Sequence, residues 1–394
     1  MTMLLASVTG VKEAQLALTH GADIIDLKDP AKGALGALDP DVVRVVVSAI
    51  GGRRPVSAVA GDLPMEPDVI VAAVEAMAAT GADYVKVGLF PGAKRADCIW
   101  ALTPVARRVR LVGVLFADAE PDVGLLPLLA EGGFAGAMLD TARKGAGRLL
   151  DHADLTALTE FIRLCRSHEL LNGLAGSLET PDVPRLLLLA PDYLGFRGAL
   201  CAGHDRKAGL DPNAVILIRG LIPRDPRGAA VESAEPSKAD YWQLAARGYS
   251  GDAGKDGGAD RLFVYDFVMP VRIGVYNKER AAAQDVRFNV IAEIGRATQP
   301  ASDMRDVLSY DIITDGIRLI AAGGHIPLAE TLAERIADFV LAHARVQAVT
   351  VKVEKLEVGS GSVGVEIRRQ RAAEVAKVYQ LYPAAGKGGP RSSD

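Results

Sequence analysis

The chain has few cysteines, no excess of positive charge and no long uncharged apolar run. Its 394 residues include only Cys98, Cys165 and Cys201, which lie far apart and form no CxxC pair, so we expect reduced thiols in a cytoplasm rather than disulfides. The net charge of -4 gives no reason to expect nucleic acid or an anionic membrane as a partner. No apolar run is long enough to cross a membrane.

Signals for metal binding and for export are also missing. The six histidines are scattered, none forms HExxH and none pairs with a cysteine cluster, so neither a structural metal nor a cofactor is expected. Residues 1–10 are apolar but lack a basic leader and a cleavage site, and we expect them to form a buried first strand. Apolar residues make up 49% and charged residues 24%, as in ordinary globular proteins.

Residues 1–220 alternate between strand-like and helix-like segments eight times. The strand-like runs lie near residues 3–8, 23–28, 55–61, 83–88, 110–116, 135–140, 171–175 and 192–198. Helical periodicity fills the gaps, as in residues 67–80 and 181–190, which both open with a proline suited to a first turn. This rhythm predicts a closed (β/α)8 TIM barrel. An open doubly wound sheet is the alternative, and it is disfavoured because no Gly-rich fingerprint follows the first strand.

The pattern changes after residue 220. Residues 221–260 combine proline, glycine and charge and indicate a linker. A small antiparallel α+β domain is predicted for 261–370, with strands at 261–273 and 285–296, helices at 309–323 and 328–344, and a hairpin of 347–356 and 363–369. A GxGxxG pattern at 359–364 precedes a strand rather than a helix, so we interpret it as a hairpin turn. Residues 383–394 indicate a flexible tail.

Charged residues end the second, fourth and sixth strand-like runs. Lys28, Lys86 and Asp140 hold these positions, and side chains from alternate strands share a layer inside a barrel. Two clustered ammonium groups depress each other's pKa, and burial adds to this effect, so one lysine can be a neutral amine near neutral pH. Such an amine can form a Schiff base with a carbonyl substrate. Solvated lysines at the barrel rim are the alternative interpretation.

The seventh and eighth runs end in small residues. Gly176, Ser177 and Gly198 would expose backbone N–H groups there, and Arg197 adds a guanidinium, at the place where barrels commonly bind phosphate. The loop at 203–207 supplies further donors. Tight turns are the alternative use of these glycines. Taken together, the residues predict class I aldol chemistry on a phosphorylated carbonyl compound.

Several segments of the first unit resemble the (5-formylfuran-3-yl)methyl phosphate synthase family. They are 21–30 (GADIIDLKDP), 32–36 (KGALG), 82–89 (ADYVKVGL), 138–142 (MLDTA) and 174–177 (LAGS), within a resemblance that covers nearly all of residues 3–220. The resemblance implies condensation of two glyceraldehyde 3-phosphate molecules, with loss of phosphate and water, to a furan aldehyde phosphate used for methanofuran-type cofactors. It further implies a Schiff base on Lys28, proton transfer by Lys86, active-site roles for Asp140 and Lys144, and phosphate binding by Gly176, Ser177, Arg197 and Gly198.

The second unit resembles dihydroneopterin aldolase over about residues 261–369. The matching segments are 274–280 (GVYNKER), 308–312 (LSYDI), 328–337 (LAETLAERIA) and 349–355 (VTVKVEK). The resemblance implies retro-aldol cleavage of a dihydropterin without a Schiff base or a metal. Glu330 would anchor the pterin, Lys355 would move protons, Tyr310 would orient a water or hydroxyl, and Glu279 would bind at the edge of a neighbouring subunit. A homo-oligomer is therefore implied.

The sequence thus predicts a bifunctional enzyme with aldol chemistry in both halves. One alternative is a Schiff-base sugar-phosphate aldolase similar to deoxyribose-phosphate aldolase, with a second domain that only assembles oligomers. Another is a non-catalytic barrel that binds a phosphorylated metabolite. For the second unit, a relative with a shifted substrate and an inactive oligomerising relic both stay open.

Overall fold

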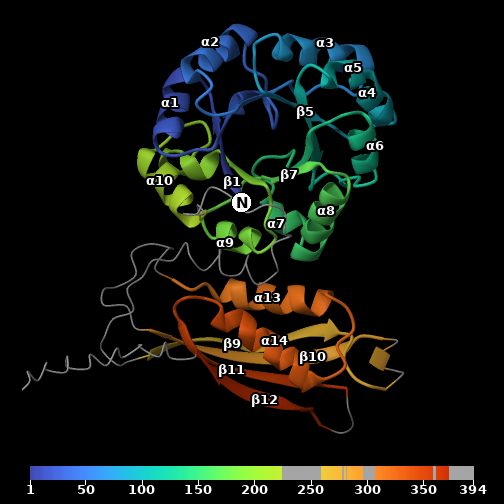
Figure 1. Ribbon diagram of the computed structural model, residues 1–394, viewed down its shortest axis with the longest axis vertical. Helices are drawn as coiled ribbons and strands as arrows, with labels where there is room; N and C mark the ends of the chain where they lie inside the picture. The colour runs from blue at the N-terminus through green and yellow to red at the C-terminus, as the bar shows by residue number, and fades with distance from the viewer. Residues whose placement is uncertain (224–258, 277–278, 281, 296–306, 358–360, 372–394) are drawn as a thin grey trace, which may run out of the picture.

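The structure is a computed structural model that describes residues 1–223, 259–276, 279–280, 282–295, 307–357 and 361–371. Most of the predicted linker at 221–260, all of the predicted tail at 383–394 and residues 359–360 of the glycine pattern lie outside these ranges. Figure 1 shows two units, a ring of strands enclosed by helices and a sheet covered by helices. No helix within the described ranges is long and apolar enough to cross a membrane.

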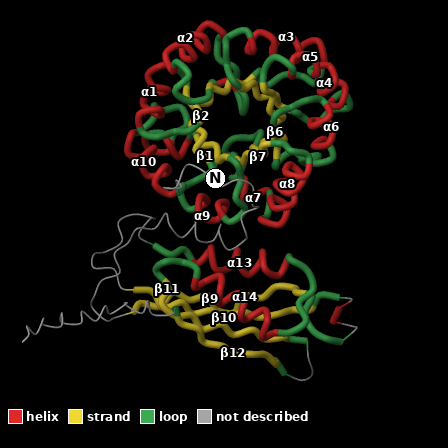
Figure 2. The backbone as a smooth tube through the Cα atoms, viewed as in Figure 1, coloured by secondary structure: helices red, strands yellow, loops and turns green. Residues whose placement is uncertain are grey.

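Eight parallel strands close into a barrel in chain order, which confirms the predicted fold. They are β1 (Met3–Val8), β2 (Ile24–Leu27), β3 (Val56–Val59), β4 (Tyr84–Gly88), β5 (Arg110–Phe116), β6 (Gly136–Asp140), β7 (Leu171–Leu174) and β8 (Tyr193–Phe196). The outer helices are α1 (Val11–Thr19), α2 (Pro40–Ile50), α3 (Pro67–Ala78), α4 (Arg95–Ala101), α5 (Thr103–Ala106), α6 (Leu125–Glu131), α7 (Leu149–His152), α8 (Leu155–Ser167), α9 (Asp182–Leu187) and α10 (Pro212–Leu221). Figure 2 shows the strands as an inner ring.

Three aspartates lock neighbouring strands together at the amino end of the barrel. Asp23 lies just before β2 and accepts from the backbone N–H of Leu4 in β1 at 2.9 Å. Asp83 bonds Val56 in β3 in the same way at 2.8 Å, and Asp192 bonds the N–H of Asn172 in β7 at 2.8 Å. Charge-assisted bonds of this kind satisfy an N–H at the first or second residue of a strand.

The barrel contains two apolar clusters separated by the strands. The larger one lies between strands and helices, where α2, for example, buries Val43, Val46 and Ile50. The smaller one fills the interior and includes Phe116 and Met138. The charged residues Lys28 and Asp140, which follow β2 and end β6, lie at the carboxyl end of the barrel.

The second unit is a four-stranded antiparallel sheet with order β12-β11-β10-β9. Its elements are β9 (Ala259–Val271), β10 (Gln284–Gly295), α13 (Tyr310–Ala322), α14 (Ala329–Leu341), β11 (Val346–Lys355) and β12 (Val363–Gln370). Alternate residues of β10, such as Phe288 and Val290, are buried in a core shared with the helices. The alternation predicted from the sequence therefore places one face of the sheet against α13 and α14. The other face carries exposed side chains, including Phe263 and Tyr265, whose rings stack.

The two units contact each other through α13. This helix packs against α8 and α9 of the barrel, and Figure 1 shows it between the barrel and the sheet. Asp315 of α13 is fully buried, and the Arg185 guanidinium of α9 donates to it at 2.5 and 3.2 Å. Arg318 adds a second guanidinium at 2.9 Å. Arg318 belongs to α13 itself, so the bidentate bond from Arg185 is the part of this cluster that joins the two units.

Candidate functional site

Lys28 follows β2 directly and lies in the barrel interior. Its side chain is buried, and its backbone N–H bonds the Val8 carbonyl at 3.1 Å, which extends the pairing of β1 and β2 by one residue. Burial lowers the pKa of Lys28 to about 8, and the charges of Lys86 and Lys144 act in the same direction, against Asp140 and Asp26. About a tenth of this amine is therefore neutral at pH 7 and about half at pH 8.

The strand register brings Lys86 to the same height as Lys28. Leu27 pairs with Ala58 and Ala58 with Val85, so the residues after Leu27 and Val85 lie level with each other. The Lys86 ammonium is buried and donates to Asp26 at 2.5 Å. The structure thus brings both predicted lysines into one interior layer.

Asp26 is the carboxylate between the two lysines. It accepts from the hydroxyls of Ser7 at 2.8 Å and Ser57 at 2.5 Å, in addition to its bond with Lys86. Burial acts to raise the pKa of Asp26, but the charges of Lys86 and Lys28, together with the hydrogen bonds from Lys86 and Ser57, hold it below its ordinary value. Asp26 is therefore an anion with all its contacts fixed from β1, β3 and β4.

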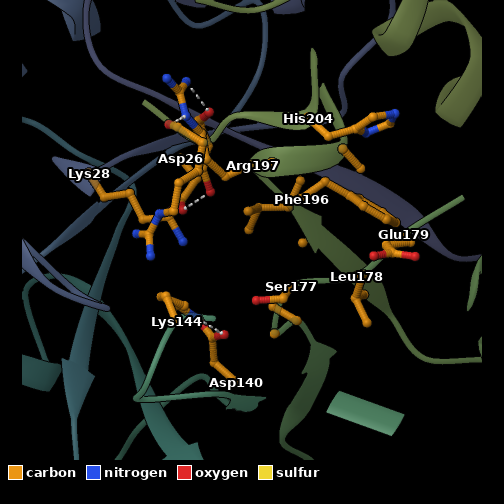
Figure 3. Close-up of a pocket in the computed structure, with 18 of the residues that line it drawn as sticks. Asp26, Lys28, Asp140, Lys144, Ser177, Leu178, Glu179, Phe196, Arg197 and His204 are labelled. Atoms are coloured by element: carbon orange, nitrogen blue, oxygen red, sulfur yellow. Dashed lines mark hydrogen bonds and ion pairs between the residues drawn. The ribbon is translucent and has the colours of Figure 1, made fainter. Parts of the chain in front are cut away.

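Asp140 and Lys144 form a second ion pair that borders the same space as Lys28 (Figure 3). Asp140 ends β6, and Lys144 Nζ donates to it at 2.6 Å and to the Thr141 hydroxyl at 3.2 Å. Burial works against ionisation, yet Lys144 and Lys28 lower the pKa of Asp140 to about 2. Asp118 holds the loop that carries Lys144, because it accepts from the N–H groups of Ala142 and Arg143 at 2.7 and 2.8 Å.

Gly176, Ser177 and Gly198 lie where β7 and β8 end, as predicted. Their backbone N–H groups donate to no acceptor among the described residues. Gly176 has a φ of 119°, and a Cβ there would lie 2.9 Å from Thr141 Cγ2. Only glycine fits this turn. The turn presents backbone N–H groups that are free to meet a ligand.

Arg197 borders the same cavity but is bound to the protein. Its guanidinium donates to Glu13 at 2.6 Å and to the carbonyls of Ser7, Ala208 and Arg206 at 3.1, 2.8 and 2.9 Å. The guanidinium therefore ties β1 and α1 to the loop after β8. It can act on a bound phosphate by its charge, and a direct contact would require these bonds to be exchanged.

A cavity of about 490 Å³ connects these groups at the carboxyl end of the barrel. Its lining includes the charged residues Asp26, Lys28, Asp140, Lys144, Glu179, Arg197 and Arg206, together with Gly176, Ser177, Gly198 and His204. In Figure 3 the Lys28 side chain lies on one side of this space, and Ser177 and the Lys144–Asp140 pair border another. Lys86 does not border the cavity, and it reaches the site through Asp26.

Sequence reasoning missed Asp26, Asp62 and Asp118. Asp62 accepts from the N–H groups of Ala34 and Leu35 at 3.0 and 2.8 Å and thereby holds the loop that follows Lys28. Asp26 had a visible signal, because a carboxylate inside an apolar strand is as unusual as the lysine two positions later. Asp62 and Asp118 lie in loops, and no sequence pattern separates them from solvated aspartates.

In the second unit, two of the four predicted site residues are in contact with each other. Lys355, at the end of β11, donates to Glu279 at 2.9 Å, and Glu279 also accepts from the Tyr276 N–H at 3.0 Å. The hydrogen bond from Lys355 is the main reason that the pKa of Glu279 lies at about 2. Gly274 allows this arrangement, because a Cβ there would lie 2.1 Å from the Glu279 carboxylate. His325 bonds the Gly274 carbonyl at 2.7 Å and closes the loop from the other side.

Tyr310 and Glu330 lie apart from that pair. Tyr310 is the first residue of α13 and is 59% exposed, and Glu330 is exposed in the first turn of α14. Within the described part of the chain, neither forms a hydrogen bond or ion pair with Glu279 or Lys355. A single chain therefore presents these polar groups on its surface.

Comparisons with known proteins agree with the division into two units. The 4-HFC-P synthase family model matches residues 4–219, and the dihydroneopterin aldolase model, FolB, matches residues 262–368. The (5-formylfuran-3-yl)methyl phosphate synthase of Methanosarcina mazei is 36% identical over 219 residues, covering 52% of this chain and 93% of that protein. A Methylorubrum extorquens protein that carries this name provisionally is 47% identical over 227 residues, covering 58% of this chain and 94% of its own.

A solved structure also matches the second unit. The dihydroneopterin aldolase of Burkholderia thailendensis, bound to guanine, is 32% identical and covers 29% of this chain and 92% of that one, with a TM-score of 0.26. The family assignment itself comes from the two sequence models, which together cover nearly all of the described residues. The chain is an enzyme that belongs to the 4-HFC-P synthase family, with a dihydroneopterin aldolase domain fused after the barrel.

Proposed function

We propose that the barrel condenses two molecules of glyceraldehyde 3-phosphate to (5-formylfuran-3-yl)methyl phosphate through a Schiff base on Lys28. The observation that carries this proposal is the environment of the Lys28 amine. It is buried, its pKa is about 8, and the two lysines whose charges act on it are each already bound to a carboxylate. The names of the similar synthases support the product, which belongs to methanofuran biosynthesis.

The first steps follow from this arrangement. The neutral amine of Lys28 attacks the carbonyl carbon of one triose phosphate, and loss of water gives the imine. The imine draws electrons from the neighbouring carbon, so the proton on that carbon can be removed to give an enamine, which attacks the second triose phosphate. Asp26 borders the cavity and is bonded to Lys86, and this pair accepts and returns the proton. The bond to Lys28 is broken again when the product is released, which restores the free amine.

The later steps require acids rather than an oxidant. Two triose phosphates differ from the product by one phosphate and two waters, so the overall reaction is a condensation with eliminations. Each elimination needs a proton for its leaving group. Lys144, held by Asp140 at 2.6 Å at the edge of the cavity, supplies that proton. The free N–H groups of Gly176, Ser177 and Gly198 hold a phosphate, and the charge of Arg197 assists them. No metal or organic cofactor enters these steps.

We further propose that the second unit cleaves 7,8-dihydroneopterin by a retro-aldol reaction. Glu330 binds the ring N–H and amino groups of the pterin, Lys355 with Glu279 transfers the proton, and Tyr310 orients the reacting hydroxyl. Tyr310 and Glu330 are exposed, which supports a site completed by a neighbouring subunit of a homo-oligomer. The edge strands β9 and β12 are open to such a neighbour. We place both reactions in the cytoplasm, in agreement with three free cysteines.

Product identification tests both parts in one preparation. The purified full chain is incubated with glyceraldehyde 3-phosphate and, separately, with 7,8-dihydroneopterin, and products are identified by mass. A furan aldehyde phosphate that absorbs in the near ultraviolet is expected from the first substrate and a cleaved dihydropterin from the second. Lys28→Met should abolish only the first product and Lys355→Met only the second. A furan product that persists in Lys28→Met would contradict the Schiff-base proposal.

A further inference from the structure

The cations around the barrel cavity differ in whether a protein carboxylate already neutralises them. Lys144 is bound to Asp140 and Arg197 to Glu13, each at 2.6 Å. Neither Lys28 nor Arg206 has an ion-pair partner among the residues that the structure describes. Lys28 is the amine assigned to the Schiff base. Arg206 is thus the permanently charged side chain of the cavity that remains available to an anion.

Arg206 bridges two loops at the carboxyl end of the barrel whose strands, β8 and β2, are separated only by β1. It belongs to the loop after β8, and its Nη2 donates to the Gly33 carbonyl, in the loop after β2, at 3.2 Å. Its own carbonyl accepts from Arg197 Nε at 2.9 Å, so the backbone at this position is held from inside the barrel. The side chain is half-buried, and Asp140 and Asp62 act on it electrostatically. Arg206 therefore lies toward the β2 side, whereas Gly176 and Ser177 follow β7.

Most of the donors of Arg206 are unused. A guanidinium carries five N–H groups, and within the described part of the chain only one bond, to Gly33, is made by this one. The remaining N–H groups form a planar fork, which matches two oxygens of a phosphate. If Arg206 served only to hold the Gly33 loop, its guanidinium would not need to border the cavity, as it does.

The proposed reaction brings two phosphates into this cavity at once. Two phosphate dianions held close together in a partly buried site repel each other strongly, because the dielectric screening there is weaker than in water. The free N–H groups after β7 and β8 suit one phosphate. The second phosphate requires a separate group of donors, at a distance from the first.

We propose that Arg206 binds the phosphate of the second triose phosphate, so that the cavity has two phosphate subsites on different sides of Lys28. This inference rests on the proposed condensation of two triose phosphates. The subsite of Arg206 makes the enzyme specific for a phosphorylated partner, because an unphosphorylated aldehyde would leave the guanidinium without an anion. The first molecule, held by the backbone N–H groups, forms the Schiff base without help from Arg206.

The test compares Arg206→Gln with Lys12→Gln in the full chain. Lys12 is an exposed cation in the first turn of α1, at the same end of the barrel but outside the cavity lining. For each protein the rate of furan formation is measured against glyceraldehyde 3-phosphate concentration, and the Lys28 peptide is examined by mass after borohydride reduction. Arg206→Gln should raise the half-saturating concentration about 10- to 100-fold while the adduct on Lys28 still forms. Lys12→Gln should behave as wild type.

Two results would overturn the proposal. One is a concentration dependence for Arg206→Gln that equals that of Lys12→Gln. The other is loss of the Lys28 adduct in a folded Arg206→Gln protein, which would assign Arg206 to the first molecule. Arg206→Lys keeps the charge without the planar fork, so it should raise the half-saturating concentration less than Arg206→Gln does. It serves as the second variant if Arg206→Gln does not fold. Absence of the adduct in the wild type would instead refute the Schiff-base chemistry. The half-saturating concentrations of Arg206→Gln and Lys12→Gln would still test whether Arg206 binds a substrate phosphate.

Discussion

Lys86 donates to Asp26 at 2.5 Å inside the barrel, and both side chains are closed to solvent. This ion pair lies beside the Lys28 amine and acts on it with two charges of opposite sign. An isolated Lys86 would drive Lys28 further toward the neutral form, and an isolated Asp26 would hold Lys28 protonated. The two charges of the pair act in opposite directions on Lys28, so burial is the main cause of its lowered pKa. The pair also places a group that can carry a proton beside the amine.

The activity should depend on pH through Lys28. Its pKa of about 8 lies below the ordinary value of 10.5, so we expect the rate at low substrate concentration to fall about tenfold per pH unit well below pH 8 and to level off above it. The fold stability should change in the adjacent range, between about pH 8 and 10.5, where the amine is neutral in the folded state and charged in the unfolded state. The charged amine is disfavoured in the folded state, so its destabilising effect is complete below about pH 8 and disappears as pH rises toward 10.5. Lys28→Met should therefore be inactive and about 1–2 kcal/mol more stable at pH 7, by denaturant unfolding. An inactive but less stable variant would contradict this electrostatic reasoning.

Asp26→Asn should damage both activity and stability. It leaves the buried Lys86 ammonium without its anion, which costs about 3–5 kcal/mol when one partner of a buried pair is removed. Loss of the Asp26 charge should also lower the pKa of Lys28 further and move the acid limb of the rate profile to lower pH. Rate profiles of wild type and variant check this shift. An unmoved limb together with a reduced maximum would make Asp26 a purely structural residue.

Gly176→Ala should weaken substrate binding. The added Cβ would lie 2.9 Å from Thr141 Cγ2 at a φ of 119°, which costs about 1–3 kcal/mol of strain and turns the N–H groups of this loop away from the phosphate. Gly52→Ala is the matched control, because Gly52 has a φ of 70° with nothing within 4 Å and lies between α2 and β3. We expect a raised half-saturating concentration for Gly176→Ala alone, from steady-state kinetics. Equal effects of the two substitutions would place the phosphate elsewhere.

Glu330→Ala should abolish binding of the pterin to the second unit. The carboxylate at the start of α14 is the group proposed to accept two hydrogen bonds from the ligand, and these are among the stronger bonds in proteins. Asp338→Ala removes an exposed carboxylate from the same helix and should leave affinity unchanged. Calorimetric titration with neopterin measures both variants. Unchanged affinity in Glu330→Ala would refute the pocket assignment.

The elements of both units could be predicted because each depends on local sequence. The barrel strands are short apolar runs separated by amphipathic helices, and the predicted run at 110–116 coincides with β5. Other boundaries moved by one or a few residues, as at 181–190, where α9 covers Asp182–Leu187. Helix ends depend on capping contacts that the periodic pattern does not contain.

The site could be predicted in part. Lys28, Lys86 and Asp140 were visible because charge at the end of an apolar strand is unusual. The pairing of Lys86 with Asp26 was not visible, because it depends on the register through β3. The contacts of Arg197 were hidden for a similar reason, since Glu13 lies 184 positions away in the sequence. Long-range pairing of this kind is decided by the closed barrel and not by any local segment.

The most direct test of the account is reduction of the wild-type chain with borohydride in the presence of glyceraldehyde 3-phosphate. Peptide mass analysis then shows which amine carries the reduced adduct. We predict a triose phosphate adduct on the peptide that contains Lys28 and none on those that contain Lys86 or Lys144. An adduct on either of these two lysines, or no adduct while the furan product still forms, would contradict the assignment of Lys28.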